Sequence, residues 1–234
     1  MDTSTIYQHT EQHVRELFRL HQSPKLLFHN LHHTEYVVQK AKEIADNYDL
    51  NEQDKLILHL ATWFHDTGYL FVSAQEHEAK SVEIMKEFAR EQQVPFDIVS
   101  EAQGCIMATR MPRDPHGLLQ EIISDADTYN FGTKEFKFTN ELVYKEIQGL
   151  TDSPLSRRKF DESALEMLKD HQFYTGYCRE NLKEGKKANI KKIKSKLEKK
   201  HVTEYDSAEP DTVITEKDGT GKGIQTLLRL TSSN

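Results

Sequence analysis

Residues 51–68 read NEQDKLILHLATWFHDTG, and this stretch decides the fold. Apolar side chains fill almost every position in its middle, so a helix here is hydrophobic nearly all round and is expected at the centre of a bundle. Asn51 is suited to cap the first turn of this helix, and Gly68 to end it. The apolar run stops abruptly at His65 and Asp66. Burying that pair is costly unless a metal ion or another charge compensates it.

Apolar periodicity predicts helices along most of the remaining chain. His33 lies one turn before Val37, and the same stripe continues through Ala41 and Ile44. Further helices are expected at about 74–91, 95–109, 119–127, 135–149 and 158–182. No alternating strand pattern with hairpin turns occurs. The predicted fold class is therefore all-α.

The composition limits the classes of function. A chain of 234 residues is long enough for one domain with a sizeable core plus appendages. Its net charge of -7 argues against a nucleic-acid partner. The first residues lack the pattern of a signal peptide, and no apolar run reaches the ~18 residues of a membrane span. The two cysteines have no CxxC spacing, so we expect a cytoplasmic protein.

The character of the sequence changes after residue 182. Residues 183–200 contain nine lysines and two glutamates with a narrow apolar stripe, which indicates a basic surface helix. An anionic partner or a membrane surface is the alternative role for this segment. Residues 201–234 are polar and poor in aromatic side chains, which is typical of a linker or tail. The predicted organisation is a domain over 1–182, a basic helix over 183–200 and a polar tail over 201–234.

Three short motifs carry a family resemblance: FHNLHHTEYV at residues 28–37, HDTG at 65–68 and DAD at 125–127. In this order they resemble the HD-domain superfamily of metal-dependent phosphohydrolases, over about residues 10–182. The resemblance implies an HD-domain helical bundle with a metal site between buried helices. At the matching positions of this chain, the implied metal ligands are His33, His65, Asp66 and Asp127. Two imidazoles and two carboxylates suit a divalent cation such as Mn, Fe, Co, Ni, Zn or Mg.

Two aspartates compete for the last ligand position. Asp127 is preferred over Asp125 because its sequence context matches the ligand aspartate of the family. Asp127 also lies in phase with Leu119 and Ile123, and therefore on the apolar side of its predicted helix.

His77 and Thr109 bear on the number of metal ions. Family members that bind two metals have further histidines, and His77 occupies the place of one of them. Thr109 stands where the next histidine is expected. A mononuclear site is therefore predicted, with His77 near the substrate or as a weak second ligand. A purely structural His77 is the alternative.

The implied chemistry is hydrolysis of a phosphoester by a metal-activated water. Asp66 is suited to ligate the metal and also to orient or deprotonate that water. His77 or Glu78 is expected to relay a proton. Arg110 is expected to face phosphate with its planar guanidinium, and His29 to contact phosphate or support a ligand. Surface or structural roles for Arg110 and His29 are equally consistent with the sequence.

The leading functional hypothesis is a metal-dependent phosphohydrolase that acts on a nucleotide or a cyclic nucleotide. A second hypothesis is a catalytically weak or inactive module that binds a nucleotide and regulates an attached membrane effector; Thr109 favours this view. A di-iron oxygenase is a third, and it needs a histidine where Thr109 stands. The sequence leaves open the substrate, the native metal and whether the chain forms a homo-oligomer.

A second resemblance concerns residues 222–234, KGIQTLLRLTSSN. They look like the segment that joins an HD domain to a membrane-helix module in bacterial proteins of the Pycsar antiphage effector type. This resemblance implies a membrane module in a longer form of the chain.

Overall fold

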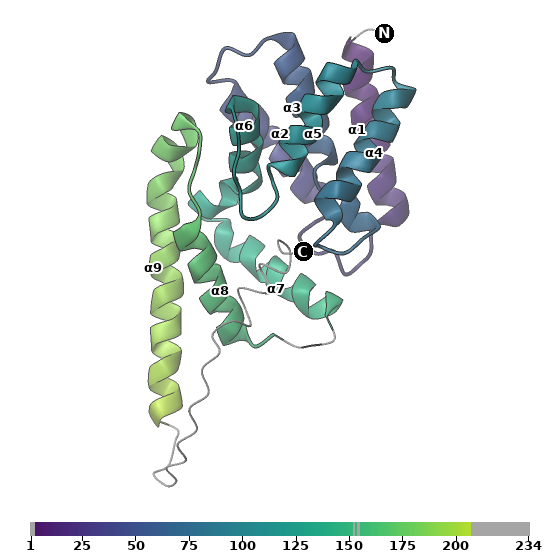
Figure 1. The fold of residues 1–234 in the computed structure, drawn as a ribbon. Helices are drawn as coiled ribbons and strands as arrows, with labels where there is room; N and C mark the ends of the chain where they lie inside the picture. Colours follow the sequence, from purple (N-terminus) through teal and green to yellow (C-terminus); the bar gives the residue numbers. More distant parts are fainter. Residues whose placement is uncertain (1–2, 152, 154, 207–234) are drawn as a thin grey trace.

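The computed structural model describes residues 3–151, 153 and 155–206, and within this part the chain is helical and contains no strand. The α-helices are α1 (Thr3–His21), α2 (Leu31–Ala45), α3 (Glu52–Phe64), α4 (His77–Glu91), α5 (Phe96–Met107), α6 (Leu118–Asp127), α7 (Phe136–Leu150), α8 (Arg157–Asp170) and α9 (Gly176–Asp206) (Figure 1). Two short 3-10 helices follow α3 and α6, namely η1 (Thr67–Leu70) and η2 (Tyr129–Gly132). The predicted all-α fold is confirmed.

Helix α3 is the central helix of the first half of the chain. It contacts α1, α2, α4, α5 and α6, and its side chains from Leu56 to Phe64 are buried except for His59. The Asn51 side chain caps its first turn by accepting a hydrogen bond from the Asp54 backbone N–H at 2.9 Å. The hydrophobic sequence therefore produces the expected central helix, and the carboxyl end of this helix lies inside the protein.

Gly68 does not end α3 as the sequence suggests; the helix ends at Phe64, and Gly68 lies in η1. The glycine is needed there for space, because a Cβ atom at this position would lie 2.0 Å from the His77 backbone oxygen. The Gly68 N–H donates to the Ser81 hydroxyl at 2.8 Å. This close approach brings the start of α4 against the polar end of α3.

The single helix predicted over 158–182 is wrong: two helices, α8 and α9, occupy this region with residues 171–175 between them. The break depends on a distant side chain. Buried Asp125 on α6 accepts hydrogen bonds from the Tyr174 and Thr175 backbone N–H groups at 2.9 and 2.8 Å. Those two N–H groups are thereby paired without continuing a helix. Helical periodicity does not contain this information.

Helix α9 runs without a break through residues 182 and 200, where the sequence predicts the ends of the domain and of the basic helix. Its buried side chains include Leu182 and Ile193, and Ile193 packs in one cluster with residues of α8. The basic helix is thus the middle of a longer one that lies along α8 (Figure 1). Residues 207–234, with most of the predicted tail and all of the linker-like segment, lie outside the described residues.

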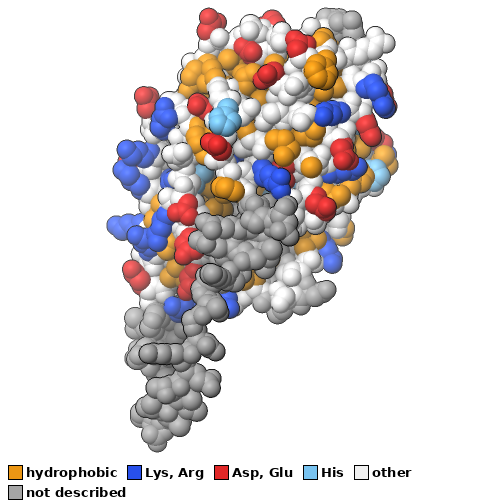
Figure 2. Space-filling model, in the orientation of Figure 1, with side chains coloured by type: hydrophobic (Ala, Val, Ile, Leu, Met, Phe, Trp, Pro, Cys, Tyr) orange, Lys and Arg blue, Asp and Glu red, His pale blue; other side chains and the backbone are white. Residues whose placement is uncertain are grey.

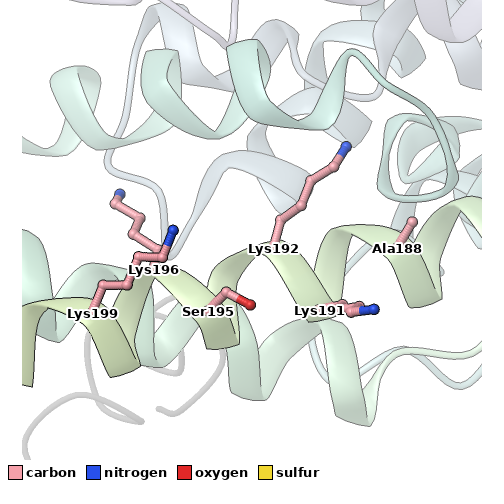
Figure 3. A pocket seen from close by; sticks show the side chains of 6 residues that line it. All are labelled: Ala188, Lys191, Lys192, Ser195, Lys196 and Lys199. Atoms are coloured by element: carbon pink, nitrogen blue, oxygen red, sulfur yellow. The ribbon is translucent and has the colours of Figure 1, made fainter.

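The outer side of α9 is rich in positive charge, and Figure 2 shows lysine and arginine side chains gathered along it. A shallow hollow beside this helix is lined by Ala188, Lys191, Lys192, Ser195, Lys196 and Lys199 (Figure 3). Lys196 is not free to bind there, since its Nζ lies 2.6 Å from the Asp161 carboxylate. Among the described residues, no helix is long and apolar enough to cross a membrane.

Helix α1 is not among the helices predicted from the sequence, although a signal for it exists. Ile6, Thr10, Val14 and Phe18 recur every four residues, and all four side chains are buried. They form one face that packs on α3 and η1. Thr10 interrupts the apolar stripe, but its hydroxyl donates to the Ile6 carbonyl at 2.7 Å and so remains satisfied.

Candidate metal centre

Three helices bring the predicted ligands together. His33 lies in the first turn of α2, where the Asn30 side chain accepts a hydrogen bond from the His33 N–H at 3.1 Å. His65 follows the last residue of α3, and Asp127 is the last residue of α6. One ligand atom from each of these three side chains lies within 4.8 Å of the others. Asp66 is next to His65 in the chain and joins the same cluster.

The distances within the cluster are short. The His33 Nε2 atom lies 3.0 Å from Asp127 Oδ1 and 3.3 Å from Asp66 Oδ2. The His65 Nε2 atom lies 3.2 Å from the same Asp66 oxygen and 3.8 Å from the same Asp127 oxygen. Two imidazole nitrogens and two carboxylate oxygens therefore converge on one small volume.

Two atoms of this cluster lack hydrogen-bond partners. The His65 Nδ1–H group donates to the Thr62 carbonyl at 2.8 Å, so its Nε2 atom carries a lone pair and faces the carboxylates. His65 Nε2 and Asp66 Oδ2 are buried without a hydrogen-bond partner among the described residues. A buried lone pair without a donor is costly, and a divalent cation compensates both at once. The residues present fit a metal ion.

The electrostatics of the cluster favour a bound cation. Burial alone would lower the pKa of His33, but Asp127 and Asp66 outweigh it and raise this pKa to about 9. Burial also acts to raise the pKa of Asp127, but Arg113 above all holds that pKa well below its usual range. The pKa of Asp66 is likewise lowered, against the effect of burial, by His65 and His33. Both carboxylates are therefore charged and attract positive charge.

Asp125 and Asp127 have separate roles in the structure. The Asp125 carboxylate is fully buried and accepts a hydrogen bond from the Thr175 hydroxyl at 2.6 Å, in addition to the two backbone N–H groups of the α8–α9 connection. Its oxygens are thus already used. Asp127 lies beside His33, as the sequence prediction requires of a ligand.

His77 and Glu78 lie at the edge of the cluster. The His77 Nδ1–H group donates to the Ala74 carbonyl at 2.7 Å, and its Nε2 atom lies 3.6 Å from Asp66 Oδ1. Burial lowers the pKa of His77 to about 4, so its imidazole is neutral at neutral pH. Burial raises the pKa of Glu78 to about 7, although Arg110 opposes the shift. Glu78 is therefore able to hold or release a proton near neutral pH.

Thr109 occupies the position of the missing histidine and carries no imidazole. Its side chain is buried, and its hydroxyl donates to the Ile106 carbonyl at 2.7 Å. This hydrogen bond fixes the orientation of the Thr109 hydroxyl at the end of α5. A single metal site thus stays the prediction.

His29 forms an ion pair and an aromatic stack at the other edge of the cluster. Its Nδ1 atom contacts the Glu146 carboxylate on α7, and the same carboxylate accepts from the Phe28 N–H at 2.7 Å. Burial acts to lower the pKa of His29, but Glu146 outweighs it and raises that pKa. The Tyr69 ring lies between His29 and His77, with centroid separations of 4.0 Å on both sides. Tyr69 therefore spaces the two imidazoles.

The arginine that contacts a predicted ligand is Arg113 rather than Arg110. The Arg113 guanidinium pairs with the Asp127 carboxylate and also donates to the Ser124 carbonyl. Arg110 is partly buried, and its positive charge acts to lower the pKa of Glu78. The structure does not bring Arg110 to the four ligand side chains.

Sequence reasoning missed Tyr69, Arg113 and Glu146. Tyr69 directly follows the HDTG motif, so its place near the centre could have been expected from the chain alone. Arg113 lies in the polar connection between α5 and α6, where no periodicity guides a prediction. Glu146 lies on α7, and only the packing of α7 against the segment before α2 brings it to His29.

Comparison with known proteins supports the assignment made from the motifs. Residues 30–131 match the family model of the HD domain, which supports membership of the HD-domain superfamily for this part of the chain. Members of this superfamily are generally metal-dependent hydrolases, and the four predicted ligands lie inside the matched segment. No curated protein and no solved structure matches the chain. His29 and Glu146 lie outside the matched segment.

Proposed function

We propose that the protein is a metal-dependent phosphohydrolase that cleaves a phosphoester of a nucleotide or a cyclic nucleotide. One observation carries the proposal: ligand-type atoms of His33, His65, Asp66 and Asp127 converge, and two of these buried atoms have no hydrogen-bond partner among the described residues. Such a mixed nitrogen and oxygen site suits Mn, Fe, Co, Ni, Zn or Mg. When bound, the metal ion lowers the pKa of a coordinated water and neutralises charge on phosphoryl oxygens.

The residues around the ligands are suited to move a proton. Asp66 uses its Oδ2 atom toward His33 and His65, while its Oδ1 atom is 3.6 Å from His77 Nε2. We expect Asp66 to orient an attacking water, with its Oδ1 atom on the side that faces His77. Glu78, whose pKa is raised by burial to about 7, is the group best suited to accept the proton and return it to solvent.

The substrate is expected to lie between the ligands and the cationic groups at their edge. Glu146 raises the pKa of His29 and so favours its protonated form, which is suited to donate a proton or a hydrogen bond to the leaving oxygen. Arg110 is suited to contact a phosphate through its guanidinium. A small anionic ester fits this set of groups better than a peptide or a glycoside, because no nucleophile motif accompanies the metal ligands.

The test is elemental analysis of the purified full chain, as isolated and after incubation with each candidate metal. A panel of nucleoside mono-, di-, tri- and cyclic phosphates is then assayed for products by chromatography. His65→Ala serves as the matched inactive control. Failure of the wild-type protein to hold any divalent metal after reconstitution would overturn the proposal.

A regulatory nucleotide-binding module is the second candidate, and Thr109 is the observation that favours it. Thr109 stands where a histidine is expected, so the centre has fewer imidazole ligands than a two-metal site needs. A metal-loaded protein that cleaves nothing in the panel, yet gains thermal stability with one nucleotide, would identify this function. In that case an attached membrane effector in a longer form of the chain becomes the expected partner.

A further inference from the structure

Arg113 is a buried cation held against the metal centre. It lies in the connection between α5 and α6, and only 7% of its side chain is exposed. Its guanidinium contacts the Asp127 carboxylate through Oδ2 and also the carbonyl oxygen of Ser124. Both acceptors belong to the last turn of α6, where free carbonyls favour a positive charge.

The two oxygens of Asp127 therefore have different partners. Oδ2 is occupied by Arg113, whereas Oδ1 lies 3.0 Å from His33 Nε2 and 3.8 Å from His65 Nε2. A carboxylate held on one oxygen by a planar fork cannot turn freely about its last bond. It offers a single oxygen to the volume between the two imidazoles.

The backbone of Arg113 is itself anchored. The Tyr174 hydroxyl donates to the Arg113 carbonyl at 3.1 Å, and the Tyr174 N–H donates to Asp125 at 2.9 Å. The α8–α9 connection thus ties Arg113 to the same helix that carries Asp127. A surface arginine would not be fixed at both its backbone and its side chain in this way.

We infer that Arg113 is a positioning residue that restricts Asp127 to one-oxygen coordination and so sets the affinity and coordination number of the metal centre. The inference rests on the metal centre proposed above. Arg113 would act on Asp127 as hydrogen-bonding groups act on metal ligands in other proteins, where they fix the orientation of the ligand. Within the part of the chain that the structure describes, Asp127 is the one ligand of the four with an arginine partner.

The test uses the full chain with its metal removed by chelation and then titrated with Mn²⁺ by calorimetry, for the wild type, Arg113→Gln and Arg113→Lys. Arg113→Gln is expected to weaken Mn²⁺ binding by about 10–100-fold. Loading with Co²⁺ should change the visible absorption of Arg113→Gln, because freeing the second oxygen of Asp127 changes the coordination number. Arg113→Lys keeps the charge but cannot hydrogen-bond both acceptors. Its Mn²⁺ affinity should therefore lie between those of the wild type and Arg113→Gln.

Arg157→Gln is the matched control, since Arg157 also forms a partly buried ion pair, with Asp161 at 2.9 Å on α8, away from the ligands. It should bind Mn²⁺ like the wild type. Folded Arg113→Gln with unchanged Mn²⁺ affinity and Co²⁺ spectrum overturns the inference, as does complete restoration by lysine, which would reduce the role to charge. If Arg113→Gln does not fold, Arg113→Lys is compared with the wild type. A changed Co²⁺ spectrum then supports the inference, and an unchanged spectrum overturns it. Wild-type protein that binds no cation would instead overturn the metal centre itself.

Discussion

Asp125 and Asp127 lie two residues apart on α6, yet their carboxylates serve opposite sides of the helix. Asp125 accepts from the Tyr174 and Thr175 N–H groups of the α8–α9 connection, and Asp127 lies 3.0 Å from His33 Nε2. Asp125 thus has a structural role, whereas Asp127 occupies the position expected of a metal ligand. Sequence spacing alone favours Asp127 but does not reveal what Asp125 does.

Separate alanine substitutions should distinguish these two roles. Asp127→Ala is expected to lose the bound metal, because one of four ligands is removed. Asp125→Ala is expected to keep the metal but lose about 1–3 kcal/mol of stability, since it leaves buried N–H groups without an acceptor. Metal content by elemental analysis and chemical denaturation measure the two effects. Metal loss in Asp125→Ala alone would show that the ligand assignment is wrong.

Much of the fold was predictable because burial repeats with the helical period. The central helix at 52–64 and its Asn51 cap follow from apolar pattern and cap chemistry. The break at 171–175 was not predictable, because it depends on Asp125, which meets this segment only in the folded chain. Local patterns encode helices, whereas the ends of α8 and α9 are determined by a tertiary contact.

In the candidate site, too, some residues were predictable from the sequence and others were not. His33 and His65 lie on or at the end of apolar stripes, so their convergence could be predicted from phase and motif. Arg113 and Glu146 come from segments whose sequence carries no comparable signal. The phosphate contact expected of Arg110 stays a prediction, whereas the arginine that pairs with Asp127 is Arg113, from an irregular connection without a sequence pattern.

The aromatic ring of Tyr69 should contribute more to the stability of the protein than its hydroxyl group does. The ring stacks on His29 and His77, and its hydroxyl makes no hydrogen bond among the described residues. Tyr69→Leu is therefore expected to cost about 1–3 kcal/mol, from two aromatic contacts. Tyr69→Phe should keep most of that stability.

The two Tyr69 variants also separate the stack from other roles in activity. Tyr69→Leu should lower kcat/KM on the best substrate more than Tyr69→Phe does, because it releases both imidazoles. Denaturation curves and steady-state rates at saturating metal provide the measurements. Equal loss of kcat/KM in both variants would point to the hydroxyl as a substrate contact and contradict the spacing role.

Gly68 should not tolerate a side chain. A Cβ atom there would lie 2.0 Å from the His77 backbone oxygen, so Gly68→Ala must push α4 away from η1. We expect a loss of about 1–3 kcal/mol or more from overpacking. Gly149→Ala in α7 is the control, because its nearest neighbour would be 3.9 Å away. That variant should be neutral or gain about 0.5–1 kcal/mol. Thermal unfolding of both proteins gives the comparison, and similar melting temperatures would refute the close approach.

The His29–Glu146 pair should make activity and stability depend on pH. The proposed proton donor is protonated His29, so kcat/KM should fall as pH rises through the His29 pKa, which Glu146 raises above the ordinary value of ~6.5. Glu146→Gln removes the charge that outweighs burial. It is therefore expected to move this fall in activity to lower pH. The measurement is a pH–rate profile at saturating metal for both proteins.

The same pair makes a prediction for unfolding. The raised pKa of His29 gives stability that is fully present below the unfolded histidine pKa and is lost as pH rises through the folded value. The lowered pKa of Glu146 gives stability that is present above the unfolded glutamate pKa and is lost as pH falls through its folded value. The wild type should thus exceed Glu146→Gln in melting temperature most clearly between pH ~4.3 and ~6.5. A constant difference across pH 4 to 9 would mean that Glu146 acts only as an acceptor for the Phe28 and His29 N–H groups, and not as the charge partner of the imidazole.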